Sequence, residues 1–207
     1  MKISYAVTVC NEIDEITKLL NFLQLNIRKE DEIVIQYDES SVTNEVKQYV
    51  DLMDMMHANH KVVGFPLNKD FASFKNNLKS NCSGDYIFQI DADEIPHSAL
   101  IEYLPEVLTN NPVDIVFVPR VNTVEGLTDE HIQKWGWKVN EKGWVNWPDY
   151  QTRIYKNTED VTWMNKVHEK ITGYNDFSNF PMEEHWALYH PKKIDRQEKQ
   201  NNFYETI

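Results

Sequence analysis

The chain has 207 residues and a formal net charge of −12 at pH 7. This length suits one α/β domain with a substantial hydrophobic core. The acidic balance disfavours binding to a nucleic-acid backbone, which needs a basic surface. No apolar run in the sequence approaches the length of a membrane span, and the N-terminus lacks the cleavage region of a signal peptide. We therefore expect a cytoplasmic protein.

Strand and helix patterns alternate along the first 119 residues. Apolar, β-rich runs predict strands at 3–9, 32–37, 61–65, 85–90 and 113–119. Apolar residues at helical spacing predict a helix that opens at residues 11–12, and others at 44–56, 70–80 and 98–109. This alternation predicts an α/β fold with a largely parallel sheet and right-handed crossovers. In such sheets ligands bind beyond the carboxyl ends of the strands.

Polar residues follow three of the predicted strands, and they should lie along one sheet edge. They are Cys10-Asn11-Glu12, Asp38 and Asp91-Ala92-Asp93. Asp91 and Asp93 are two apart, so extended backbone would send both carboxylates to one side and Glu94 to the other. Such a pair needs a positive partner, and hard divalent cations prefer oxygen ligands. The alternative is an acidic loop in which Asp93 or Glu94 only caps the helix near Ser98.

Several familiar sites are absent from the sequence. Its six glycines form neither GxGxxG nor GxxxxGK[ST], which argues against dinucleotide-fold oxidoreductases and P-loop hydrolases. His168-Glu169 lacks the second histidine of a zinc-protease helix, and no GxSxG elbow exists. A carboxylate pair at a sheet edge without a phosphate loop remains, and it indicates a metal that holds phosphates.

The pattern changes after Arg120. All six tryptophans lie between residues 135 and 186, among glycine, asparagine and proline. We expect residues 120–155 to form long loops and short antiparallel strands over the sheet edge, and residues 194–207 to form a polar surface helix. Indole rings offer large apolar faces and an N–H hydrogen-bond donor. We expect most of these rings to be core and one or two to face the cleft.

Five segments resemble, in the right order, the signatures of family 2 glycosyltransferases. They are VTVCNEIDEI (7–16), the Asp38 cluster, DFASFKNN (70–77), FQIDADEI (88–95) and WMNKVHEKITG (163–173). The resemblance implies a GT-A-like three-layer α/β/α fold in a single domain, with residues 1–119 holding a nucleotide-sugar and residues 120–207 facing the acceptor. It also implies metal-dependent inverting transfer, with Mn²⁺ or Mg²⁺ as cofactor, a UDP-sugar as the expected donor and a glycan hydroxyl as the expected acceptor.

The resemblance also implies residue roles. Asp91-Ala92-Asp93 would be the DxD motif that binds the cation and the donor diphosphate. The nucleotide would be held by an acid after the second strand, Asp38, and by the first strand–helix turn, with Thr8, Cys10, Asn11 and Glu12. Many relatives carry Asp-Gly-Ser-Thr-Asp where this chain has Asp38-Glu39-Ser40-Ser41, which weakens the expected base contact. Asp38 could instead be a turn-forming residue.

Other candidates have a structural explanation beside the functional one. Lys75 is either a phosphate contact or a solvated cation. Arg120 and Arg153 lie where the sheet edge should be, as ligands or as salt-bridged structural arginines. His190, in LYH, is the expected third metal ligand and His168 is the other candidate, although a lone histidine also serves as a core or surface group.

Inverting transfer needs a carboxylate that takes the proton from the acceptor hydroxyl. A metal-bound carboxylate has lost basicity and lies on the wrong side of the sugar, so the base must come from the later half. Glu169 is preferred and Asp149 is the alternative; Glu169 could also be a capping or salt-bridged surface residue. Two rival functions stay open: a metal-dependent nucleotidyltransferase or phosphohydrolase, and a non-catalytic sugar-binding domain on the same fold.

Overall fold

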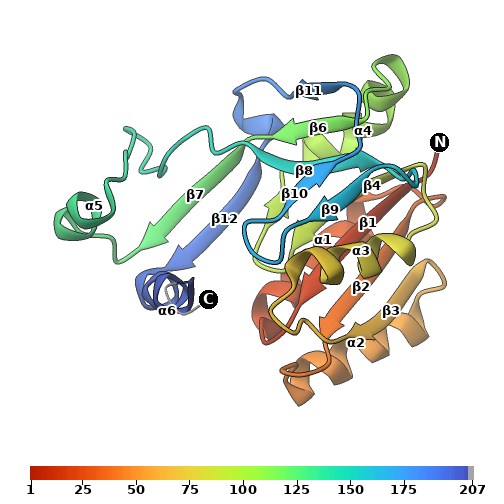
Figure 1. The fold of residues 1–207 in the computed structure, drawn as a ribbon, viewed down its shortest axis with the longest axis horizontal. Helices are drawn as coiled ribbons and strands as arrows, with labels where there is room; N and C mark the ends of the chain where they lie inside the picture. Colours follow the sequence, from red (N-terminus) through yellow and green to blue (C-terminus); the bar gives the residue numbers. More distant parts are fainter. Residues whose placement is uncertain (205–207) are drawn as a thin grey trace.

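The computed structural model describes the backbone of residues 1–204 and the side chains of residues 1–199. Its main sheet has seven strands in the order β11-β6-β8-β4-β1-β2-β3 (Figure 1). These are β1 (Ile3–Val9), β2 (Glu32–Asp38), β3 (His60–Phe65), β4 (Tyr86–Asp91), β6 (Ile115–Val118), β8 (Gln151–Lys156) and β11 (Phe177–Asn179). Among these strands only β8 runs antiparallel to its neighbours, β4 and β6. The expected mostly parallel sheet is confirmed, with β4 at its centre.

Both faces of this sheet are covered, because successive side chains of a strand point to opposite faces. Tyr5 and Val7 of β1 belong to one buried cluster and Ala6 to the other. Three helices pack on the first face: α1 (Ile13–Asn26), α2 (Asn44–Met56) and α4 (Ser98–Asn110). The second face is covered by α3 (Phe71–Ser80) and the hairpin of β9 (Thr162–Met164) and β10 (Lys170–Thr172). The predicted three-layer arrangement is confirmed.

Local capping explains where the helices begin. Thr43 accepts a hydrogen bond from the N–H of Val46 at the start of α2, and Asp70 accepts one from Ser73 at the start of α3. The cap of α4 is His97, whose Nδ1 accepts from the N–H of Ala99 at 3.1 Å. Neither Asp93 nor Glu94 caps this helix, so that alternative is wrong and both acids have other partners.

A second, three-stranded sheet extends from the main one (Figure 1). Its order is β5-β12-β7, with bounds β5 (Ile95–Pro96), β12 (Leu188–Lys193) and β7 (Arg120–Glu125). β7 runs parallel to β12, and α5 (Asp129–Trp135) follows it. The expectation of only loops and antiparallel strands in residues 120–155 is therefore wrong, since β7 finds a parallel partner far along the chain. A short 3₁₀ helix, η1 (Glu184–Trp186), precedes β12.

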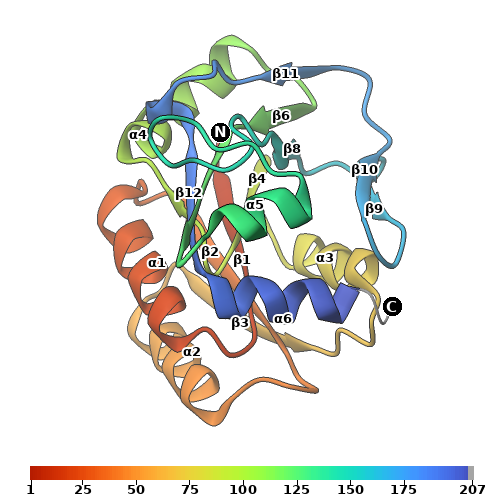
Figure 2. The ribbon, with the colours of Figure 1, turned by 90° about the vertical axis from the view of Figure 1, so that its left-hand side faces the viewer.

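The predicted tail helix exists as α6 (Ile194–Tyr204), and residues 205–207 of that expectation lie outside the described residues. Figure 2 shows α5 and α6 on the same side of the molecule. Within the described residues, no helix combines the length and the apolar character that crossing a membrane requires.

The tryptophans do not form the expected core. Trp163 is buried, with 6% of its surface exposed, whereas the other five are only partly buried. Trp186 stacks on Phe180 with ring centroids 4.8 Å apart and packs against the main core. Trp135 packs on Trp137 and Trp144 packs on Trp147, with ring centroids 4.6 and 4.9 Å apart, so these rings contact one another rather than the buried core.

Candidate active site

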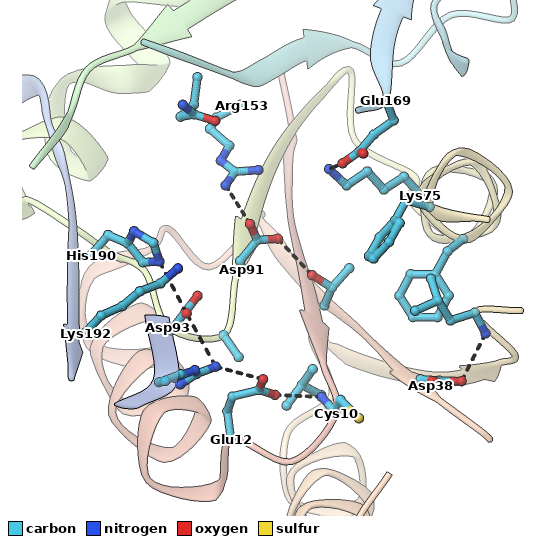
Figure 3. A pocket seen from close by; sticks show the side chains of 18 of the residues that line it. Cys10, Glu12, Asp38, Lys75, Asp91, Asp93, Arg153, Glu169, His190 and Lys192 are labelled. Atoms are coloured by element: carbon cyan, nitrogen blue, oxygen red, sulfur yellow. Dashed lines mark hydrogen bonds and ion pairs between the residues drawn. The ribbon is translucent and has the colours of Figure 1, made fainter. Parts of the chain in front are cut away.

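A cavity of about 490 Å³ opens at the carboxyl ends of β1, β2 and β4 (Figure 3). Its walls also include residues of α3, β8, β12 and α6, and Glu169 just before β10. Most residues singled out from the sequence line it: Thr8, Cys10, Glu12, Asp38, Lys75, Asp91, Ala92, Asp93, Arg153, Glu169 and His190. Asn11 and Asp149 are not among the lining residues. The fold thus joins one end of the sheet to segments more than a hundred residues away.

Asp91 lies at the end of β4, directly beside Thr8 of β1 in the strand register. Its Oδ1 accepts a hydrogen bond from Thr8 Oγ1 at 3.0 Å, and its Oδ2 accepts one from Arg153 Nη2 at 2.6 Å. Burial alone would raise the pKa of Asp91, but the positive charges of Arg153 and Lys75 outweigh it and hold the pKa well below its usual range. Asp91 is therefore ionised and already has a cationic partner.

The geometry predicted for the three acids is wrong, because the strand stops at Asp91. Residues 92 and 93 form a turn, closed by a hydrogen bond from the N–H of Glu94 to the carbonyl of Asp91 at 2.9 Å. Glu94 then points inward, with a fully buried side chain. It accepts from Arg153 at 2.6 Å and from Arg120 at 3.0 Å. Asp91 and Glu94 thus share one arginine, while Asp93 faces elsewhere.

Asp93 faces the second sheet and the last helix. Its Oδ2 lies 3.3 Å from His190 Nε2 on β12 and 3.4 Å from Arg196 Nη2 on α6. Burial would raise the pKa of Asp93, but the contacts with His190 and Arg196 lower it overall. On the other side of the imidazole, Nδ1 lies 2.7 Å from Asn122 Oδ1, so Nδ1 carries a proton. Nε2 is then the atom that faces the carboxylate.

The turn between β1 and α1 is held by Glu12. Its Oε2 accepts hydrogen bonds from the N–H groups of Cys10 at 2.8 Å and Asn11 at 3.0 Å. Its Oε1 accepts from Arg196 at 2.9 Å. Burial raises the pKa of the Cys10 thiol, which stays protonated. Glu12 therefore fixes the backbone of this turn and connects it to α6.

Asp38 ends β2 and organises a turn of its own. Its carboxylate accepts from the N–H groups of Ser40 and Leu67, both at 3.0 Å, and is bonded to the Ser41 hydroxyl. The turn-forming role is therefore present, and the side chain lines the cavity as well. The contact between Asp38 and a nucleotide stays a prediction.

Glu169 and Lys75 stand on the opposite side of Asp91 from His190 and Asp93 (Figure 3). Lys75 Nζ forms an ion pair with Glu169 Oε1 and lies 4.3 Å from the centroid of the Trp163 ring. Only 7% of Lys75 is exposed, so it is not the solvated cation that the sequence allowed. Asn76 of α3 exchanges two hydrogen bonds with the backbone of Trp163, which fixes the hairpin before Glu169 against α3.

Asp149 lies in a different place from Glu169. It lines a second cavity of about 250 Å³, which shares Arg120, His190 and Lys192 with the first. Its Oδ2 accepts two hydrogen bonds from Arg120, at 2.6 and 2.9 Å, and one from Asn122 at 2.9 Å. This carboxylate anchors β7 rather than facing the larger cavity, and Trp137 lines the second cavity beside it.

Arg120, which the sequence placed at the sheet edge, lines the cavity as well. Sequence reasoning missed several other lining residues: Ser41, Leu67, Phe71, Phe74, Gln151, Lys192 and Arg196. Lys192 could have been found, because it is two residues from His190 and shares its face of a strand. Arg196 gave no such signal, since its partners Glu12, Glu15 and Asp93 are distant in the chain.

The sequence profile described as glycosyl transferase family 2 matches residues 4–186. The chain belongs to this family. Among solved structures, this family 2 chain is similar to TarS 1–349 of S. aureus, with a TM-score of 0.66 at 17% identity over 92% of this chain and 60% of that chain. For the same protein in complex with UDP-GlcNAc, the TM-score is 0.67 at 18% identity, over 93% of this chain and 59% of that one. The chain thus spans about 60% of the length of that fragment.

A more distant likeness is to the mannosyltransferase PcManGT of Pyrobaculum calidifontis, solved with GDP-Man and Mn²⁺. The TM-score is 0.50 at 18% identity over 57% of this chain and 35% of that one. Among curated protein sequences, none matches this chain. At these identities the structural likeness establishes the fold, and the expected GT-A-like class is confirmed.

The side chains of Asp91, Asp93 and His190, which we call the acidic edge of the cavity, are of the types that bind a divalent cation, although all three do not converge on one point. Carboxylate and imidazole suit Mn²⁺. With Nδ1 of His190 protonated, neutral Nε2 and Asp93 Oδ2 would be two acceptors 3.3 Å apart, an arrangement that needs a proton or a metal ion between them. Within the described residues, however, no three histidine, cysteine or acidic side chains gather closely enough to hold a metal ion. Asp91, the other acid of this edge, is already bound by Arg153.

Proposed function

We propose that the chain is a metal-dependent, inverting glycosyltransferase that moves a sugar from a nucleotide-sugar donor to a hydroxyl of a glycan acceptor. The observation that carries this proposal is the arrangement of the cavity, with Asp91 and Asp93 at one side and a separate carboxylate, Glu169, at the other (Figure 3). Family membership supports sugar transfer. The complexes of S. aureus TarS with UDP-GlcNAc and with UDP support a UDP-sugar as the donor.

The donor would lie mainly against residues 1–119 and the acceptor toward residues 120–207. The turn held by Glu12 and the turn held by Asp38 border the space proposed for the nucleoside. Phe71 and Phe74 offer apolar surface on the same wall. Arg153, from residues 120–207, also lines this cavity. The two parts would therefore share the donor site within a single domain. The cytoplasmic location stays a prediction.

Asp93 and His190 would hold Mn²⁺ or Mg²⁺, with Asp91 next to them. When bound, the cation supplies positive charge that stabilises the diphosphate as it leaves. Thr8 and Arg153 keep Asp91 ionised and fixed at the end of β4. Asn122 fixes the imidazole of His190 so that Nε2 faces Asp93. These contacts set the orientation of the ligands before any donor binds.

Glu169 would act as the base. In inverting transfer the acceptor oxygen attacks the anomeric carbon from the face opposite the leaving diphosphate, and a carboxylate takes the hydroxyl proton. Glu169 stands across the cavity from His190 and Asp93, as this geometry requires (Figure 3). Lys75 holds Oε1 of Glu169, which leaves the hydroxyl to approach the second carboxylate oxygen. Asp149 is the weaker candidate, because it is bound to Arg120 outside this cavity.

Calorimetric titration with UDP-, GDP- and CDP-sugars, with and without Mn²⁺, tests the proposal. We expect Mn²⁺-dependent binding of a UDP-sugar, accompanied by slow release of UDP and free sugar. Release of inorganic phosphate or of nucleoside monophosphate would instead favour a phosphohydrolase or nucleotidyltransferase. Binding without turnover on any acceptor of a glycan panel would favour a non-catalytic sugar-binding domain.

A further inference from the structure

Arg196 brings a positive charge into contact with Asp93 at the acidic edge of the cavity. It lies in the first turn of α6, and its guanidinium contacts three acids from two other elements. The distances are 2.9 Å to Glu12 Oε1, 3.1 Å to Glu15 Oε1 and 3.4 Å to Asp93 Oδ2. These contacts run from Glu12 through the guanidinium to Asp93, whose Oδ2 also lies 3.3 Å from His190 Nε2.

The contact with Asp93 differs in kind from the other two. Glu12 and Glu15 belong to the start of α1, so their pairs with Arg196 fasten α6 to the β1–α1 turn. Asp93 Oδ2 is instead the atom that also faces His190 Nε2, which is the position proposed above for the divalent cation. A guanidinium and a divalent cation cannot both lie at this oxygen without strong repulsion, because both are positive and the site is largely enclosed.

We infer that Arg196 is an internal competitor of the divalent cation for Asp93, and that α6 thereby lowers the affinity of the acidic edge for the cation. This inference rests on the proposed function, because it requires the cation to bind at Asp93. With its guanidinium at Asp93, the protein keeps this buried carboxylate neutralised when no cation is bound. A cation that binds must displace the guanidinium from Asp93, while Glu12 and Glu15 retain it nearby.

Two other cationic side chains, Lys192 and Arg153, lie near the acidic edge. Lys192 lines the same cavity from β12, on the strand face that also carries His190. Arg153 is committed to Asp91 and Glu94 at 2.6 Å each. Arg196 is the charged group that combines direct contact with Asp93, partial exposure and a place on a terminal helix.

The test is the dissociation constant of Mn²⁺ alone, measured by calorimetry and by the electron paramagnetic resonance signal of free Mn²⁺. Arg196→Gln removes the charge, and we expect it to bind Mn²⁺ about two- to fivefold more tightly than the wild type, which is the upper part of the range for a partly exposed ion pair. Arg196→Lys keeps the charge and should bind as the wild type does. Lys193→Gln removes an equal charge from an exposed neighbouring position and should also leave the affinity unchanged.

The outcomes separate the inference from the proposed function. Tighter binding by Arg196→Gln alone, or binding by this variant where the wild type shows none, supports the inference. Equal Mn²⁺ affinity in the wild type and Arg196→Gln overturns it while the metal site stands. An equal gain in Lys193→Gln overturns it too, since the effect would then be bulk charge. Failure of every protein to bind Mn²⁺ overturns both the inference and the proposed metal dependence.

Discussion

Arg153 neutralises two acids in the interior, and its removal should destabilise the fold in a pH-dependent way. In Arg153→Met, Asp91 and Glu94 each lose a contact of 2.6 Å. Breaking a buried ion pair costs about 3–5 kcal/mol. Arg120 still pairs with Glu94, and 36% of the Asp91 side chain is exposed, so the expected loss is smaller, about 2–4 kcal/mol. For a domain of this size that corresponds to a drop in Tm of about 4–16 °C.

The dependence on pH distinguishes this mechanism from a simple loss of packing. In the wild type the folded pKa of Asp91 is lowered, so its stabilising contribution is present above the unfolded value of about 3.9 and is lost as pH falls through the folded pKa. Without Arg153, fewer positive contacts oppose the burial of Asp91, so its folded pKa rises and its charge destabilises the fold at high pH. The Tm difference between variant and wild type should therefore narrow from pH 8 to pH 5.

Differential scanning calorimetry across this pH range is the assay. Lys156→Met is the matched control, because Lys156 lies on the same strand in a surface pair with Asp114 and should change Tm by no more than about 2–4 °C. A Tm difference for Arg153→Met no larger than that of the control, or one that is constant with pH, would refute the argument.

Three further outcomes are expected. Glu169→Gln should reduce turnover, measured by UDP release, by about two to four orders of magnitude, with donor affinity, measured by calorimetry, little changed. Near-normal turnover in Glu169→Gln together with loss of turnover in Asp149→Asn would assign the base to Asp149. Asp93→Asn should abolish Mn²⁺-dependent donor binding with Tm within a few degrees, and undiminished affinity would remove the DxD assignment. Glu32 is largely buried, which raises its pKa, but Lys2 and other donors lower it overall to about 2. It therefore stabilises the fold above pH 5, by up to about 3 kcal/mol, and this contribution is lost toward pH 2. In Glu32→Gln, the free energy of unfolding measured by urea titration should fall less steeply between pH 5 and pH 2 than in the wild type. An unchanged fall would contradict this role of Glu32.

The residue pattern alone determined the α/β layers of the first 119 residues. Strands such as Ile3–Val9 and Tyr86–Asp91 are predominantly apolar runs, and the helices between them have apolar faces at helical spacing. Both signals are local, so no partner needs to be known. The same reasoning placed Asp91 at the edge where the first strand ends, because parallel strands end at one edge, and in the structure Asp91 pairs with Thr8.

Only the tertiary structure decided how the charges pair and what closes the cavity. Asp93 sits in a turn rather than in extended backbone, so it faces His190 and Arg196 instead of the arginine that Asp91 shares with Glu94. The pairing of β7 with β12 likewise joins segments far apart in the chain, and no local periodicity encodes it. Partner choice for a charged side chain depends on which groups the fold brings within a few ångströms. That information lies in the packing of the whole chain and not in the spacing of residues along it.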